Sequence, residues 1–78
     1  MKLQFENIGR ERRSFEVEVD IDYRAAPEKF ERALKKELRA HKLTRATAID
    51  CVPTTTDGSN GIVFAGRHRA GEWRRAGA

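Results

Sequence analysis

The feature that most constrains the fold of this chain is a strict alternation of apolar and polar side chains from Phe15 to Arg24. Successive side chains of a β-strand point to opposite faces, whereas a helix would scatter both sets around its circumference. The segment is therefore predicted to be an antiparallel strand with one face on a core and the other in solvent. The apolar set is Phe15, Val17, Val19, Ile21 and Tyr23, and the acidic set is Glu16, Glu18, Asp20 and Asp22.

Three further segments are predicted as strands of the same sheet: residues 2–6, 45–52 and 62–67. Residues 9–13 would form the hairpin loop before the long strand. The Pro-, Thr- and Gly-rich segment 53–61 is predicted to be a flexible loop, because it contains no apolar residue to anchor it. The pattern leaves open which face of the third strand is buried. Ala70 and Gly71 are expected to turn the chain once more near its end.

One helix is predicted between the second and third strands. Pro27 suits a first helical turn, where a backbone N–H has no partner within the helix. Apolar side chains recur at helical spacing and form a stripe for packing on the sheet: Phe30, Ala33, Leu34 and Leu38, with Leu43 just beyond. The order is β-β-α-β-β, and the fold class is α+β, a small antiparallel sheet with one helix on one face. Residues 1–75 form a single domain, and residues 76–78 are expected to fray.

The charge of the chain is basic and unevenly distributed. Sixteen Lys and Arg residues face twelve Asp and Glu residues, which gives a net charge of +4. Eleven of the sixteen cations are arginines, which form forked contacts to phosphate and carboxylate. From residue 40 onward there are six cations and only three anions. This balance favours a polyanionic partner, either a nucleic acid or an acidic protein surface.

The sequence contains no arrangement of residues typical of a catalytic, metal or cofactor site. His41 and His68 have no second His or Cys at zinc-ligand spacing. Neither Ser14 nor Ser59 has a general base in a recognisable arrangement. Residues 58–61 match the G-x-x-G loop of KH domains in letters only, because that loop joins two helices and this segment joins two predicted strands. We therefore expect a protein that is not an enzyme and has no metal or cofactor.

The expected compartment is the cytoplasm. Cys51 is the only cysteine, which fits a reducing compartment or simply a small buried side chain. The N-terminal residues are charged and alternating, and no apolar run approaches the ~20 residues that span a bilayer. No membrane partner is expected.

The acidic face of the long strand has three interpretations. Glu16, Glu18, Asp20 and Asp22 could form a metal or general-acid site, but groups two residues apart lie about 7 Å from each other and point the same way. A solvated outer face that pairs with arginines of neighbouring strands explains them better. The third interpretation is an acidic stripe that docks a basic partner.

The candidate binding residues are arginines in the first hairpin loop and near the end of the chain, with one tryptophan among them. Phosphate contacts need accessible cations rather than exact spacing, and an exposed aromatic ring offers bases a stacking surface. The set is Arg10, Arg12, Arg13, Arg67, Arg69, Trp73, Arg74 and Arg75. Two alternatives stay open: the arginines balance the charge of the sheet, and Trp73 closes the end of the small core.

Two segments of the chain resemble small accessory proteins of bacterial prophages and integrative mobile elements. They are Leu3-Gln4-Phe5-Glu6-Asn7-Ile8-Gly9-Arg10 and Gly61-Ile62-Val63-Phe64-Ala65-Gly66-Arg67, and neither is a defined motif. The resemblance implies a class of function and no site residues. Such proteins act by binding, and they block or redirect a machine of the host or of the element.

The sequence thus predicts a small, basic, non-catalytic binding protein that occludes a nucleic acid or a nucleoprotein complex, as a regulator or an inhibitor. The alternative is a protein–protein interaction module without nucleic-acid contact. Its exposed sheet edge would pair with a host protein or, in a homodimer, with a second copy. Salt separates the two, because phosphate binding weakens steeply with ionic strength. Replacing Arg74 and Arg75 together by alanine would flatten that salt dependence.

Overall fold

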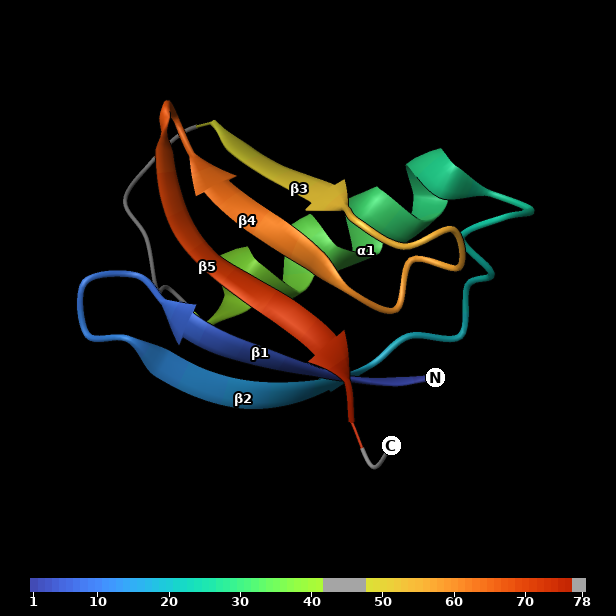
Figure 1. Ribbon diagram of the computed structural model, residues 1–78, viewed down its shortest axis with the longest axis horizontal. Coiled ribbons are helices and arrows are strands. Elements are labelled where there is room, and N and C mark those ends of the chain that lie inside the picture. Colours follow the sequence, from blue (N-terminus) through green and yellow to red (C-terminus); the bar gives the residue numbers. More distant parts are fainter. Residues whose placement is uncertain (42–47, 77–78) are drawn as a thin grey trace.

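The computed structural model describes residues 1–41 and 48–76, in which one helix packs on one face of a five-stranded antiparallel sheet (Figure 1). The sheet order is β2-β1-β5-β4-β3, so the last strand of the chain lies between β1 and β4. The predicted α+β class is confirmed. In chain order the elements are β1 (Lys2–Ile8), β2 (Arg13–Glu18), α1 (Pro27–Ala40), β3 (Ile49–Pro53), β4 (Gly61–Ala65) and β5 (His68–Arg75).

The sheet holds one strand more than the sequence predicts. The turn expected at Ala70–Gly71 lies earlier, at Gly66–Arg67, where Gly66 adopts φ +64°. β5 then runs without a turn to Arg75. The register against β4 shifts at Ala70, which is an extra residue on β5 and therefore a β-bulge. A glycine beside a bulge resembles a turn when only the local sequence is considered.

β2 is shorter than the alternation that predicts it. It ends at Glu18, although Val19 is still buried and its N–H donates to the Met1 carbonyl at 2.9 Å. Beyond that point the Asp22 carboxylate accepts the N–H of Arg24 at 3.0 Å, which turns the chain toward α1. The prediction of a strand through Arg24 is therefore wrong beyond Glu18, and Val19 is already outside the strand. The two apolar residues after it, Ile21 and Tyr23, pack against the core from a loop.

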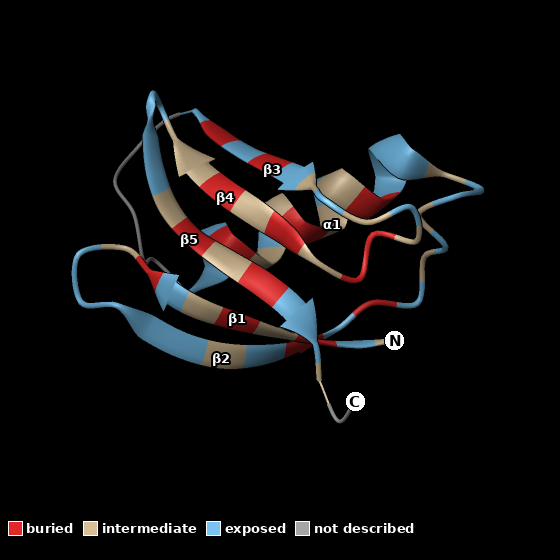
Figure 2. Ribbon diagram, in the orientation of Figure 1, coloured by how far each residue is buried: buried red, intermediate tan, exposed pale blue. Residues whose placement is uncertain are grey.

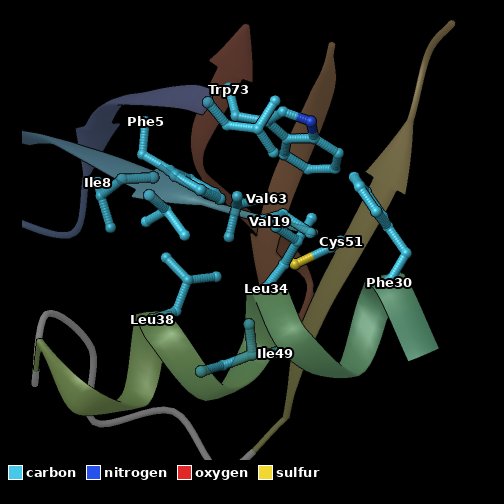
Figure 3. Packing of buried hydrophobic residues seen from close by; sticks show 12 residues of the cluster. Phe5, Ile8, Val19, Phe30, Leu34, Leu38, Ile49, Cys51, Val63 and Trp73 are labelled. Carbon is cyan, nitrogen blue, oxygen red and sulfur yellow. The ribbon is translucent and has the colours of Figure 1, made fainter. Parts of the chain in front are cut away.

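The core lies between α1 and the sheet face that the helix covers. Phe30, Leu34 and Leu38 point from the helix toward the sheet (Figure 3) and have no exposed surface, as predicted; Ala33 is only half-buried. Buried and more exposed residues alternate along the strands (Figure 2). The sheet contributes Leu3, Phe5, Ile8, Val17, Ile49, Cys51, Val63 and Trp73.

The structure also answers the question of which face of the third strand is buried. Ile49 and Cys51 face the helix, and Val52 faces away from it. Leu43 and residues 45–47, expected as a core anchor and as the start of this strand, lie outside the described residues. At the end of the chain the N–H of Ala76 donates to the Lys2 carbonyl at 2.9 Å, while residues 77–78 of the expected frayed tail are also outside the described residues.

The second face of the sheet is not covered by any described element: in Figure 1 the helix runs behind the sheet and this open face is toward the viewer. Glu16 and Glu18 lie on it and are exposed. Asp20 and Asp22 come after the end of β2. The four carboxylates therefore do not form one row on the sheet.

Candidate functional site

Two tight turns that carry arginines lie at the same end of the molecule. One spans residues 9–12 between β1 and β2, and the other spans residues 66–67 between β4 and β5; both are on the left of Figure 1. The N–H of Gly9, at the start of the first turn, donates at 3.0 Å to the carbonyl of Ala70, which lies in β5 three residues beyond the second turn. Segments some sixty residues apart in the chain meet because β5 lies beside β1.

Five of the predicted arginines belong to this end, which we call the arginine end, and all five are exposed. Two of them are paired with nearby carboxylates, Arg13 with Glu11 at 2.9 Å and Arg69 with Glu72, its neighbour on β5, at 3.5 Å. Exposed pairs of this kind are weak, so both guanidinium groups can exchange their partners. The other three have no ion pair with a described residue. The arginine end consists of Arg10, Arg12, Arg13, Arg67 and Arg69.

The backbone of the first turn adopts a conformation that keeps its arginines at the surface. Gly9 adopts φ +74°, and Arg12, whose N–H donates to the Gly9 carbonyl at 3.3 Å, adopts φ +50°. The left-handed region is uncommon for a residue with a Cβ, and it occurs mostly in tight turns. Such a turn reverses the strand over few residues and leaves the side chains of Arg10 and Arg12 exposed.

The C-terminus of α1 lies beside the same end and adds a cation, Arg39, that is not among the predicted binding residues. The ring of His41 stacks on Phe15 of β2, with 4.1 Å between the ring centroids. Arg39, two residues earlier, is exposed. It ends an outward-facing row with Lys29, Arg32 and Lys36, at positions i, i+3, i+7 and i+10 of the helix. Residues at this spacing share one face of a helix.

A shallow hollow of about 290 Å³ accompanies this row of cations. It lies between the helix and the loop that precedes it, and it is lined by Ile21, Lys29, Arg32, Ala33 and Lys36. The hollow is open to solvent and has two small apolar patches among three cations.

The structure does not bring Arg74 and Arg75 to this end. Both lie where β5 ends, away from the turns, near the chain termini (Figure 1). Two nitrogens of the Arg74 guanidinium donate to one oxygen of Glu6, at 2.9 and 3.2 Å. The seven predicted arginines therefore lie at two ends of the sheet, because β5 spans the sheet and separates these ends.

Trp73 is also placed differently from the expectation of an exposed contact residue. Its side chain is 2 % exposed, and its ring packs on Phe5 with 5.8 Å between centroids. The indole N–H donates to the Gly58 carbonyl at 3.0 Å. Trp73 presents no ring to a base or a partner and belongs to the core. Inward-facing positions of β5 are buried because this strand is central in the sheet.

The loop between β3 and β4, predicted to be flexible, is tied down by hydrogen bonds. The N–H of Thr54 donates to the Asn60 carbonyl at 2.8 Å. Asp57 Oδ1 accepts the Ser59 hydroxyl at 2.7 Å and the Ser59 N–H at 3.0 Å. Gly58 is buried against the ring of Tyr23. The loop has no apolar residue of its own, and the anchor comes from aromatic residues elsewhere in the chain.

These hydrogen bonds make part of the stability of the protein depend on pH. Donation from the hydroxyl, then from the N–H, of Ser59 lowers the pKa of Asp57 to about 2. A depressed carboxyl pKa stabilises the folded state above the unfolded value of about 3.9, and this contribution is lost as the pH falls through the folded value.

In urea unfolding, wild type is expected to be more stable than Asp57→Asn at pH 6, and the difference between them is expected to close toward pH 2. The exposed Asp20→Asn is the control; a gap that persists at pH 2 would contradict this account.

The described residues do not gather a reactive group at the surface. Burial, and then the nearby Glu31 carboxylate, raise the pKa of the Cys51 thiol to about 12, so it stays neutral and unreactive. Within residues 1–41 and 48–76, no three His, Cys, Asp or Glu side chains come together as a metal site would require. No helix in that part of the chain is both long enough and apolar enough to cross a membrane.

No protein-family model, curated protein or solved structure matches this chain. The interpretation of the arginine end therefore depends on its own geometry and chemistry.

Proposed function

We propose that the protein binds a nucleic acid through the arginine end and occludes it, alone or in a nucleoprotein complex, without catalysing a reaction. The observation that carries this proposal is the Gly9–Ala70 hydrogen bond, because it ties the first turn to β5 and so supports one basic surface at the end of the sheet where all five arginines are exposed. Guanidinium groups bind phosphate oxygens through a fork of donors, and they do so without needing a defined spacing.

The charges around this surface support the same function. The carboxylates that pair with it, Glu11 and Glu72, are held only in exposed contacts, and a phosphate can replace them. The C-terminus of α1, which lies beside this end (Figure 1), adds the exposed Arg39. Readout of base edges is not part of the proposal. A surface of this kind binds the backbone and excludes other proteins from it.

The test is a fluorescence anisotropy titration of labelled single- and double-stranded DNA and RNA at 50 and 200 mM salt. Five phosphate contacts give a slope of log K against log [salt] of about −4 to −5, so affinity should fall about 10²- to 10³-fold across that range. Replacing Arg10, Arg12 and Arg67 by alanine, the three arginines without a described ion pair, should reduce the magnitude of the slope by about 3.

The control removes the same charge from the opposite end of the molecule. Arg24→Ala, Arg74→Ala and Arg75→Ala together also lower the net charge by three, and the slope should stay that of wild type. Equal slopes for the two triple variants would mean that net charge rather than the arginine end governs binding. Absence of binding at 50 mM salt would contradict the proposal and leave the protein–protein alternative.

A further inference from the structure

The open face of the sheet carries a strip of apolar side chains on β3 and β4. Its members are Val52, Ile62 and Phe64. Val52 is 46 % exposed and is the one exposed large hydrophobic residue among those described; the other two are half-buried. Val52 and Ile62 are direct cross-strand partners. Their sequence neighbours Cys51 and Val63 are buried against the helix, so the strip points away from it.

Phe64 in this strip lies between two opposite charges. Its cross-strand partner on β3 is Asp50, and its partner on β5 is Arg69. Arg69 contacts Glu72, which precedes the buried Trp73, and this contact places Arg69 on the open face. The two charged side chains are 60 % and 59 % exposed. Across the strands, the row is therefore negative, apolar and positive.

We propose that a second copy of this chain packs face to face on the strip, about a two-fold axis parallel to β4. Rotation by 180° about that axis exchanges the two sides of the sheet and keeps the direction along the strands. It places Asp50 of each copy against Arg69 of the other. Phe64 and Ile62 of one copy meet the same residues of the other. The negative–apolar–positive row is thus complementary to itself, as an isologous interface requires.

The sheet order limits what else such an interface brings together. β4 lies over β4, and β3 of one copy lies over β5 of the other. β1 and β2 then extend beyond the edge strand of the second copy, so the exposed Glu16 and Glu18 stay in solvent. Glu72 lies over Val52 of the other copy with its carboxylate bonded to Asn7 at 2.8 Å. The carboxylates that would repel each other, Glu16 and Glu18, are outside the interface. To form pairs across the interface, Asp50 and Arg69 give up only weak contacts within their own copy, such as that of Asp50 with Lys35 at 3.9 Å.

The same axis has a consequence for binding, which depends on the proposed function while the dimer itself does not. Because the direction along β4 is kept, the arginine ends of both copies lie at the same end of the dimer. Arg69 is engaged by Asp50 of the other copy, so in the dimer each arginine end offers Arg10, Arg12, Arg13 and Arg67. Two linked cationic surfaces would bind one nucleic acid with a higher apparent affinity than either alone.

The test is the solution mass, measured by sedimentation equilibrium across a range of protein concentrations and without nucleic acid. Wild type is expected to be a dimer. In a dimer of Asp50→Arg or of Arg69→Asp, like charges face each other at both symmetry-related contacts. Each substitution should therefore weaken self-association at least about tenfold. Mixing the two variants should form a heterodimer, because the arginine introduced in one then meets the aspartate introduced in the other, and the second contact is the native pair. The double variant Asp50→Arg/Arg69→Asp should dimerise as wild type does.

Glu16→Arg, on the open face but outside the strip, is the matched control and should remain a dimer. Circular dichroism verifies that every variant is folded. A wild-type chain that stays monomeric even at about 1 mM, the weak limit of specific association, would overturn the proposal. Single variants that dimerise on their own would also overturn the proposal. The same holds if the two single variants do not associate when they are mixed. None of these outcomes bears on nucleic-acid binding, so failure here is distinguishable from failure of the proposed function.

Discussion

Replacing Trp73 by alanine is expected to lower the free energy of unfolding by about 3–5 kcal/mol. The ring is 2 % exposed and is the largest fully buried side chain among the described residues. It fills the space between Phe5, on which it packs, and the backbone of Gly61. A domain of this length has a total stability of about 4–12 kcal/mol, so the variant would retain little of it.

The tryptophan also anchors the loop of residues 54–60 through its indole N–H, which donates to the Gly58 carbonyl at 3.0 Å. Trp73→Phe removes this donor and keeps most of the aromatic packing, so it should cost less than alanine. Its effect should appear as faster amide exchange at Thr54 and Gly58, whose N–H groups bond within the loop. Urea unfolding of both variants gives the two costs. An equal cost would mean that the hydrogen bond, and not the ring, is the main contribution.

Periodic features of the sequence were sufficient for the elements whose side chains repeat. The alternation of Phe15, Val17 and Val19 predicted β2, and the spacing of Phe30, Leu34 and Leu38 predicted α1 with its buried face. Each of these patterns is local, because the burial of one face of a helix or strand requires apolar residues at a regular spacing within that segment. The helix and the antiparallel strands were therefore predictable, and with them the fold class.

β5 was not predictable in the same way. Half of its eight residues from His68 to Arg75 are charged, and only Gly71 and Trp73 are buried. A central strand normally carries more apolar residues, but here one face of the sheet is open and accepts the charged side chains. A bulge at Ala70 further breaks the alternation. With β5 missing, the strand order could not be deduced either.

The candidate site was predictable in its residue types and not in its grouping. Exposure of the arginines follows from their charge. Which of them share a surface depends on the pairing of β1 with β5, which brings Gly9 to Ala70 and leaves Arg74 beside Glu6. No pattern among neighbouring residues indicates that β1 pairs with β5. The burial of Trp73 depends on the same pairing, because the ring is buried only when β5 is a central strand.

Adding a single methyl group at Gly61 is expected to destabilise the protein by about 2–3 kcal/mol, through overpacking. Gly61 is paired with Pro53 on one side and with Trp73 on the other, so its backbone is held from both directions. A Cβ at this position would overlap the carbons of the six-membered indole ring. The ring is buried and bonded to Gly58, so it cannot move aside without loss of those contacts.

The overlap predicts that the cost of Gly61→Ala depends on the residue at position 73. In a Trp73→Phe background the distal indole carbons are gone, and the same substitution should cost at least about 1 kcal/mol less, as urea unfolding of the four proteins would measure. Gly66→Ala is the control: its Cβ would meet no atom within 4 Å, and only its φ of +64° would cost about 1–2 kcal/mol, whichever residue is at position 73. Strict additivity of Gly61→Ala and Trp73→Phe would contradict the packing of this ring on the β4 backbone. Coupling would establish that the side chain expected at the surface instead holds three central strands and the loop together.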